Sequence, residues 1–169
     1  MSAQPNILFI MVDQLRPQSC GYFGDERAMT PNIDRLAREG ANFTNATSMH
    51  PVCGPYRASL LTGCHSSSTG YVINELRMRT DLPSLAGELN RHGYRSEYVG
   101  KWHLWASEAK DLKTFHQKEE NQFVPPGPDR LRFDDFWAAY NFNHQYYQSF
   151  YYQDEFKRVE PEGYEPDVM

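Results

Sequence analysis

A short apolar run near the start of the chain constrains its fold more than any other feature. Residues 6–12 are almost continuously apolar, and the run ends at Asp13 and Gln14. Such a run is typical of a central strand that is buried on both faces of a mostly parallel sheet. In open α/β sheets, the chemistry gathers at the carboxyl ends of the strands. We therefore expect Asp13 and Gln14 to lie at the functional edge of a parallel sheet.

Helix and strand signals alternate along the next part of the chain. Thr30 is a good helix N-cap, Pro31 suits the first helical position, and Gly40 stops the helix. Strand and helix alternating in this way are typical of a layered α/β fold, in which helices flank a mostly parallel sheet. The expected elements are a helix over 30–40, a strand over 41–47, helices over 55–61 and 83–91, and a strand over 94–99.

The last third of the chain has a different composition. Polar residues dominate 108–122, prolines interrupt 125–128, and aromatic residues crowd 133–156. This stretch has no clear period, and it suits an insertion packed over the sheet edge or part of a substrate rim. Its aromatic residues suit either stacking on sugar rings or core packing. We expect a single domain with its motifs at 5–105 and an insertion at 106–169.

The overall composition excludes some classes of partner. The formal net charge is −5, and the Lys and Arg residues are scattered. Nucleic-acid binding needs clustered positive charge, so we expect no nucleic-acid partner. The run at 6–12 is too short to span a bilayer and lacks the basic start of a signal peptide. We therefore expect no membrane partner and a cytoplasmic location, or a periplasmic or secreted one if a signal peptide has been removed.

Cys53 stands in the segment with the strongest chemical signal. Pro55 follows shortly after it, which places the cysteine at or just before the start of a helix. A helix N-terminus offers free backbone N–H groups and a positive dipole end, and both favour an anion. Arg57 lies roughly one helical turn after Cys53, so its guanidinium can reach back toward that side chain. The cysteine is therefore either an activated nucleophile or a buried structural residue.

Three segments together carry a family resemblance. Residues 52–63 (Val-Cys-Gly-Pro-Tyr-Arg-Ala-Ser-Leu-Leu-Thr-Gly) resemble the sulfatase signature C-x-P-x-R followed by Leu-Thr-Gly. Residues 93–103 open with Gly-Tyr and close with Gly-Lys-Trp-His, which is similar to the second signature of that family. Asp13 and Gln14 stand where the family places its first metal ligands. The chain thus resembles the type I, formylglycine-dependent sulfatases of the alkaline phosphatase-like superfamily over residues 5–105.

The resemblance implies a fold and a chemistry. The fold is the layered, alkaline phosphatase-like α/β fold with a mostly parallel sheet. In this family a maturation enzyme oxidises the motif cysteine to formylglycine, whose hydrate attacks sulfur and expels the alcohol. Sulfate then leaves by elimination as the aldehyde re-forms. The residues implied are Cys53, Arg57, Lys101 and His103 for catalysis, and Asp13, Gln14 and Cys53 for a bound Ca²⁺ or Mg²⁺.

The implied substrate is a sulfate monoester of a small molecule or a glycan. The alternatives are a phosphonate monoester or phosphodiester hydrolase of the same superfamily, and an inactive protein that binds sulfated glycans. Within the first signature, Tyr56 stands where family members often have a small residue. The family's domain is much longer than this chain, and its later metal pair, Asp followed by Asn or His, has no counterpart here. We expect an N-terminal part of the domain that is inactive without the C-terminal half.

Overall fold

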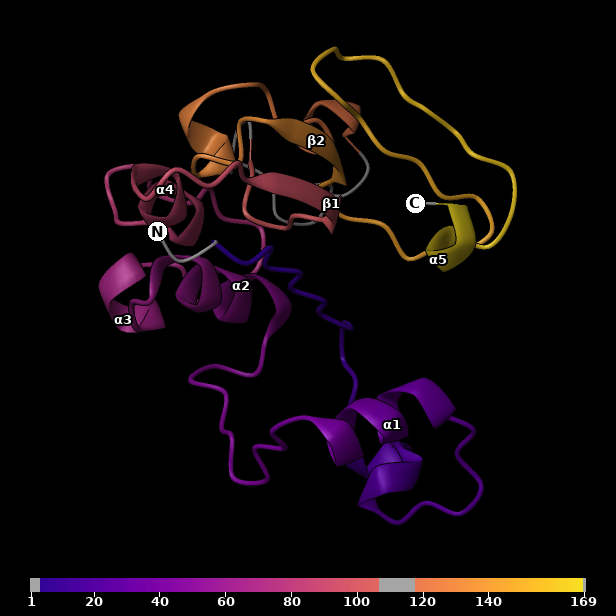
Figure 1. The fold of residues 1–169 in the computed structure, drawn as a ribbon. Coiled ribbons are helices and arrows are strands. Elements are labelled where there is room, and N and C mark those ends of the chain that lie inside the picture. The colour runs from indigo at the N-terminus through magenta and orange to yellow at the C-terminus, as the bar shows by residue number, and fades with distance from the viewer. Residues whose placement is uncertain (1–3, 107–117, 169) are drawn as a thin grey trace. The chain divides into compact units, whose positions relative to one another are not determined.

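The computed structural model describes residues 4–106 and 118–168 and divides the chain into two compact units (Figure 1). The first unit is Met1–Thr47 and the second is Ser48–Met169. The first contains the 3-10 turns η1 (Pro17–Ser19) and η2 (Gly21–Phe23) and the helix α1 (Pro31–Glu39). The second contains α2 (Cys53–Thr62), α3 (Ser66–Thr69), α4 (Leu85–Arg91), β1 (Glu97–Lys101), η4 (Glu119–Asn121), η5 (Pro128–Arg130), β2 (Phe136–Tyr140) and α5 (Glu165–Val168).

The helix predicted after Thr30 is confirmed as α1, which starts at Pro31 and ends before Gly40. The Thr30 hydroxyl accepts a hydrogen bond from the Gly21 backbone N–H at 2.9 Å and donates one to Asp34 at 2.8 Å. The Asp34 carboxylate also accepts from the backbone N–H of Tyr22 at 2.8 Å. These bonds join η2 to the first turn of α1 and hold the first unit together.

The apolar run at 6–12 does not form the expected strand. Within the described residues it pairs with no other strand, and Leu8 and Ile10 are 84% and 73% exposed. An apolar run becomes a central strand only when neighbouring strands bond to both of its edges and layers cover its faces. The expected strand at 41–47 is also wrong, because this stretch turns at residues 44–45 and leaves Phe43 81% exposed.

The second unit contains the expected parallel pairing. Strand β1 pairs in parallel with β2, from Glu97 opposite Phe136 to Lys101 opposite Tyr140. The strand predicted at 94–99 is therefore real, but it starts later and ends at Lys101. Strand β2 lies within the aromatic stretch 133–156, for which the sequence predicts no secondary structure. Part of that stretch therefore belongs to the sheet itself. In Figure 1 the two strands run side by side, in salmon and orange.

The helices that flank the motifs agree with the sequence. Helix α2 ends at Gly63, which takes the left-handed conformation with φ 69° and closes the helix as a C-cap. Helix α4 starts after Ser84, whose hydroxyl accepts from the Gly87 backbone N–H at 3.0 Å. Both helices were predicted, with boundaries shifted by about two residues. Among the described residues no helix has the length and apolar character needed to cross a membrane.

An aromatic cluster forms the core of the second unit. The rings of Tyr98 and Trp102 lie 4.9 Å apart, and those of Trp102 and Trp137 lie 5.0 Å apart. Ala58 and Leu61 of α2 pack into the same cluster. Trp102 is fully buried, and aromatic pairs of this geometry contribute about 0.5–1.5 kcal/mol beyond the area that they bury. The core therefore joins α2 to the carboxyl end of β1.

Arg130 holds the chain that follows β2 against the core. Its buried guanidinium donates to the carbonyls of Val124 and Gln153, at 3.0 and 2.8 Å, and lies 4.6 Å from the Trp137 ring centre. Burial lowers the pKa of this arginine, and an ion pair with Asp154 at 2.6 Å opposes that effect. The segment around 150–154 is thereby fixed beside β2.

Candidate active site

The structure places Cys53 at the first residue of α2, as the proline two positions later predicts. The side chain is half-buried. The next backbone N–H, that of Gly54, donates to the side-chain oxygen of Asn74 at 2.9 Å. Asn74 therefore fixes the first turn of α2 from outside the helix.

Gly54 allows a close approach between α2 and the chain after β1. A Cβ atom at this position would lie 2.5 Å from Cε1 of Tyr71 and 3.2 Å from the backbone oxygen of His103. Contacts under 3.0 Å are not tolerated without a shift of the neighbour, so a larger residue here would push these groups apart. The glycine thus lets the residue after Cys53 lie directly against His103.

Arg57 joins the first turns of α2 to the carboxyl end of β1. Its side chain is only 4% exposed. One guanidinium nitrogen donates to the backbone oxygen of Lys101 at 2.5 Å and to the hydroxyl of Tyr98 at 3.2 Å. The Tyr98 hydroxyl in turn donates to the same Lys101 oxygen at 2.5 Å. A permanently charged group from α2 is therefore held against the end of β1.

Lys101 and His103 meet at the ring of Phe142. Lys101 is the last residue of β1, and its Nζ atom lies 5.3 Å from the centre of the Phe142 ring. The His103 ring centre lies 5.0 Å from that of Phe142. His103 has φ 58°, a left-handed conformation that is uncommon for a residue with a side chain. The Tyr71 hydroxyl donates to its backbone oxygen at 2.8 Å and helps to hold this conformation.

The structure thus brings four of the predicted site residues together in the second unit. Cys53 and Arg57 come from α2, and Lys101 and His103 come from the end of β1. Tyr71 and Asn74 were not predicted, because neither stands in a recognised motif. Phe142 would have been found only if β2 had been recognised, since it follows the carboxyl end of that strand.

Asp13 and Gln14 belong to the first unit, where they form a turn after the apolar run. Both are exposed, and Gln14 has φ 56°. Their carboxylate and amide oxygens suit a hard cation such as Ca²⁺ or Mg²⁺. Such ions take six or more oxygen ligands, so this pair fits part of a site. Across 4–106 and 118–168, no group of three His, Cys, Asp or Glu side chains is arranged to share an ion.

Replacing Tyr71 with phenylalanine is expected to lower the free energy of unfolding at neutral pH. The same substitution should make this free energy fall less steeply at high pH than it does in the parent protein. Burial is the main cause that raises the pKa of Tyr71 above its ordinary value of about 10, and Glu75 adds to the shift. Because the folded pKa is raised, the stabilising contribution is complete below about pH 10 and is lost as the pH rises further. The lost hydrogen bond to His103 costs about 1 kcal/mol at neutral pH.

Urea unfolding of the parent protein and the variant, across neutral to strongly alkaline pH, measures this effect. The difference in unfolding free energy between the two proteins should narrow above about pH 10. A difference that stays constant through this range would contradict the assignment of a protonated, buried Tyr71.

Comparison with known proteins decides the family. The sulfatase family model matches residues 5–167 of the chain. The chain belongs to the sulfatase family. It is 38% identical over 152 residues to an ulvan-active sulfatase of Formosa agariphila, in a match that covers 90% of this chain and 27% of that protein. The family predicted from the two signatures is therefore confirmed.

Solved structures of sulfatase-family proteins share the fold. A Bacteroides fragilis protein assigned as a sulfatase superposes with TM-score 0.80 and 30% identity, covering 98% of this chain and 39% of that one. A protein solved in complex with its substrate D-glucosamine-2-N,6-O-disulfate gives TM-score 0.76 and 28% identity, covering 98% of this chain and 29% of that one. These matches confirm the layered, alkaline phosphatase-like α/β fold. The chain spans about a quarter of the length of the curated sulfatase above.

Proposed function

We propose that the whole protein hydrolyses sulfate monoesters. The observation that carries the proposal is the meeting of Cys53 and Arg57 of α2 with Lys101 and His103 at the end of β1. A helix N-terminus with two cationic side chains close by favours a tetrahedral anion. Such groups act more strongly in buried surroundings, and both Arg57 and His103 are buried. The family membership supports the same function.

The roles of the residues follow from their chemistry and position. Formylglycine made from Cys53 would supply an oxygen nucleophile that divides one difficult displacement into two easier steps. Arg57 orients and neutralises the bound sulfate from the first turns of α2. Lys101 offers a compact positive charge to a sulfate oxygen. His103 holds or transfers a proton at the reacting oxygen.

Asp13 and Gln14 are proposed to bind the metal, together with the modified Cys53 and with ligands from elsewhere in the whole protein. A Ca²⁺ or Mg²⁺ ion would screen the charge of the ester and polarise an S–O bond. Gln14 is neutral, so this pair places less negative charge near the sulfate than two carboxylates would. That choice of donors is compatible with an anionic substrate.

The proposal extends to partners and location. We propose a formylglycine-generating maturation enzyme and the remaining C-terminal part of the domain as partners, with neither nucleic acid nor membrane. The scattered positive charges and the net charge of −5 are the reason for proposing no nucleic-acid partner. The location proposed from the sequence is cytoplasmic, or periplasmic or secreted after removal of a signal peptide.

Turnover of nitrophenyl sulfate and of a phenyl phosphonate ester by the matured whole protein tests the function. We expect faster turnover of the sulfate, loss of activity in a metal chelator, and recovery when Ca²⁺ or Mg²⁺ is added. Faster turnover of the phosphonate would favour the alternative hydrolase of the same superfamily. Absence of turnover of both esters, with the cysteine still a thiol, would favour an inactive glycan-binding protein.

A further inference from the structure

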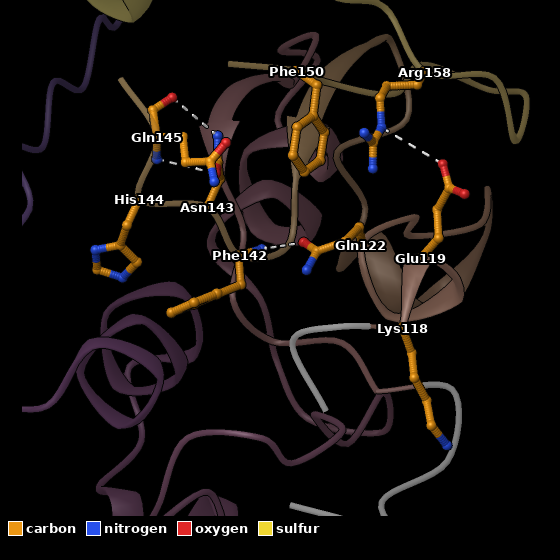
Figure 2. Close-up of a pocket in the computed structure, with 9 residues that line it drawn as sticks. All are labelled: Lys118, Glu119, Gln122, Phe142, Asn143, His144, Gln145, Phe150 and Arg158. Carbon is orange, nitrogen blue, oxygen red and sulfur yellow. Dashed lines mark hydrogen bonds and ion pairs between the residues drawn. The ribbon is translucent and has the colours of Figure 1, made fainter. Parts of the chain in front are cut away.

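A hollow of about 410 Å³ opens beside Phe142, in the second unit (Figure 2). This volume lies in the range of about 300–1,000 Å³ that is typical of small-molecule sites. Its walls come from the chain before β2, from the residues that follow β2, and from Arg158 farther along. None of the residues placed in the catalytic cluster lines it. The function proposed above therefore leaves this hollow unexplained.

Hydrogen bonds hold part of the lining and the residue next to it in place. The buried side chain of Asn141 accepts from the backbone N–H of Trp105 at 3.1 Å and donates to the carbonyls of Trp105 and Asn121, at 2.7 and 2.8 Å. The Gln122 side-chain oxygen accepts from the backbone N–H of Phe142 at 2.9 Å. These bonds fix the position of Phe142 relative to the segment before β2, so this side of the hollow is held in place.

The lining combines an aromatic ring with planar polar side chains. Figure 2 shows the Phe150 ring standing between Arg158 on one side and the segment of Asn143 and Gln145 on the other. The Arg158 guanidinium lies 4.2 Å from the Phe150 ring centre. Amide and guanidinium groups offer several donors and acceptors in fixed directions. Such groups match neighbouring hydroxyls on a ring, while the aromatic ring provides contact for C–H groups.

The charge of the hollow favours a neutral ligand over a second sulfate. Arg158 forms ion pairs with Glu119 at 3.5 Å and with Glu160 at 3.4 Å. The guanidinium charge is therefore balanced locally by two carboxylates. A site for an additional sulfate would need unbalanced positive charge. Lys118 also lines the hollow, but its ammonium points away from the other lining side chains (Figure 2). The remaining lining resembles a surface for hydroxyl groups.

Phe142 connects the hollow to the catalytic cluster. The same ring that lines the hollow contacts the ring of His103 at 5.0 Å and the Lys101 ammonium at 5.3 Å. A ligand in the hollow is therefore separated from these two residues by a single aromatic side chain. The alcohol half of a bound ester would extend over this ring into the hollow.

We propose that the hollow binds a neutral sugar ring of the substrate, so that the substrate is a sulfated saccharide. The inference rests on the function proposed above and adds the class of the alcohol. The sugar ring contacts Phe150, and its hydroxyls bond to the amides of Asn143 and Gln145 and to the Arg158–Glu119 pair. The hollow thereby selects saccharide esters over simple aryl esters.

Kinetics of the matured whole protein test this inference. The two substrates are nitrophenyl sulfate, which has no sugar ring, and a disaccharide that carries one sulfate on N-acetylglucosamine. We expect the ratio of kcat/KM for the saccharide to that for the aryl ester to fall about tenfold in Phe150→Leu. In Gln145→Ala, which changes an exposed residue, it should fall about fivefold. Tyr146→Ala is the matched control, since this exposed tyrosine lies outside the lining, and it should leave the ratio unchanged.

A second measurement separates failure of the hollow from failure of the proposed function. Calorimetric titration with the sulfate-free disaccharide should show binding that weakens about fivefold in Gln145→Ala and is unchanged in Tyr146→Ala. If the aryl ester is turned over and the ratio of the two kcat/KM values is the same in all variants, the hollow does not bind the sugar ring. The sulfatase function would stand in that case. If neither ester is turned over, the proposed sulfatase function is refuted. The titration alone then tests whether the hollow binds a sugar ring. Binding unaffected by Gln145→Ala and Phe150→Leu, or absent from the parent, would overturn it.

Discussion

Replacing Cys53 with alanine is expected to abolish turnover of nitrophenyl sulfate by the whole protein, with kcat falling by about 10⁴-fold or more. The alanine removes the atom from which the nucleophile is made and leaves the anion-binding groups in place. Binding of sulfate should therefore persist when it is measured as inhibition or by calorimetry. Because Cys53 is half-buried at the first residue of α2, a smaller side chain there should be tolerated by the fold.

Cys64→Ala is the matched control for this experiment. Cys64 is also a free, half-buried cysteine close to α2, and its thiol donates to the backbone oxygen of Thr62 at 3.6 Å. It lies outside the proposed machinery, and activity should be retained. Activity that survives in Cys53→Ala but disappears in Cys64→Ala would show that Cys64, and not Cys53, supplies the nucleophile.

Replacing Arg57 with methionine is expected to lower kcat/KM by about 10³-fold and the unfolding free energy by about 2 kcal/mol. The guanidinium is 4% exposed and bonds to the Lys101 backbone oxygen at 2.5 Å. Loss of a charged hydrogen bond accounts for the change in stability. We expect the larger effect on activity because Arg57 is proposed to bind the sulfate and also holds the end of β1 against α2.

Arg79→Met provides the comparison for Arg57. Arg79 is 54% exposed and pairs with Asp81 at 2.6 Å, an arrangement that contributes little in water. We expect no measurable change in activity or stability from this substitution. If Arg57→Met lost stability alone, with kcat/KM within about twofold of the parent, Arg57 would be a structural residue and not part of the sulfate site.

Local signals in the sequence predicted the helices well. Thr30 and Pro31 start α1, and Gly63 ends α2, because capping depends on a few neighbouring residues. The position of Cys53 at a helix start follows from the same kind of local rule. Fold class and family were predictable because whole motifs kept their order along the chain.

Features that depend on distant residues were not predictable in the same way. The run at 6–12 has the composition of a central strand, but it pairs with no strand within the described residues, and most of its side chains are exposed. Strand β2 was not predicted, because apolar and polar residues do not alternate in its aromatic stretch. Its register with β1 is nevertheless regular. Asn74 and Phe142 reach the site only through folding, so no spacing in the sequence identifies them.

Mass analysis of the tryptic peptide 39–57, from the protein isolated from its own source, shows whether Cys53 is converted to formylglycine. This peptide ends at Arg57 and contains Cys53 as its only cysteine. We expect an aldehyde at this position, which reacts with a hydrazide probe and resists alkylation by iodoacetamide. An unmodified, alkylatable thiol in protein that still hydrolyses sulfate esters would contradict it.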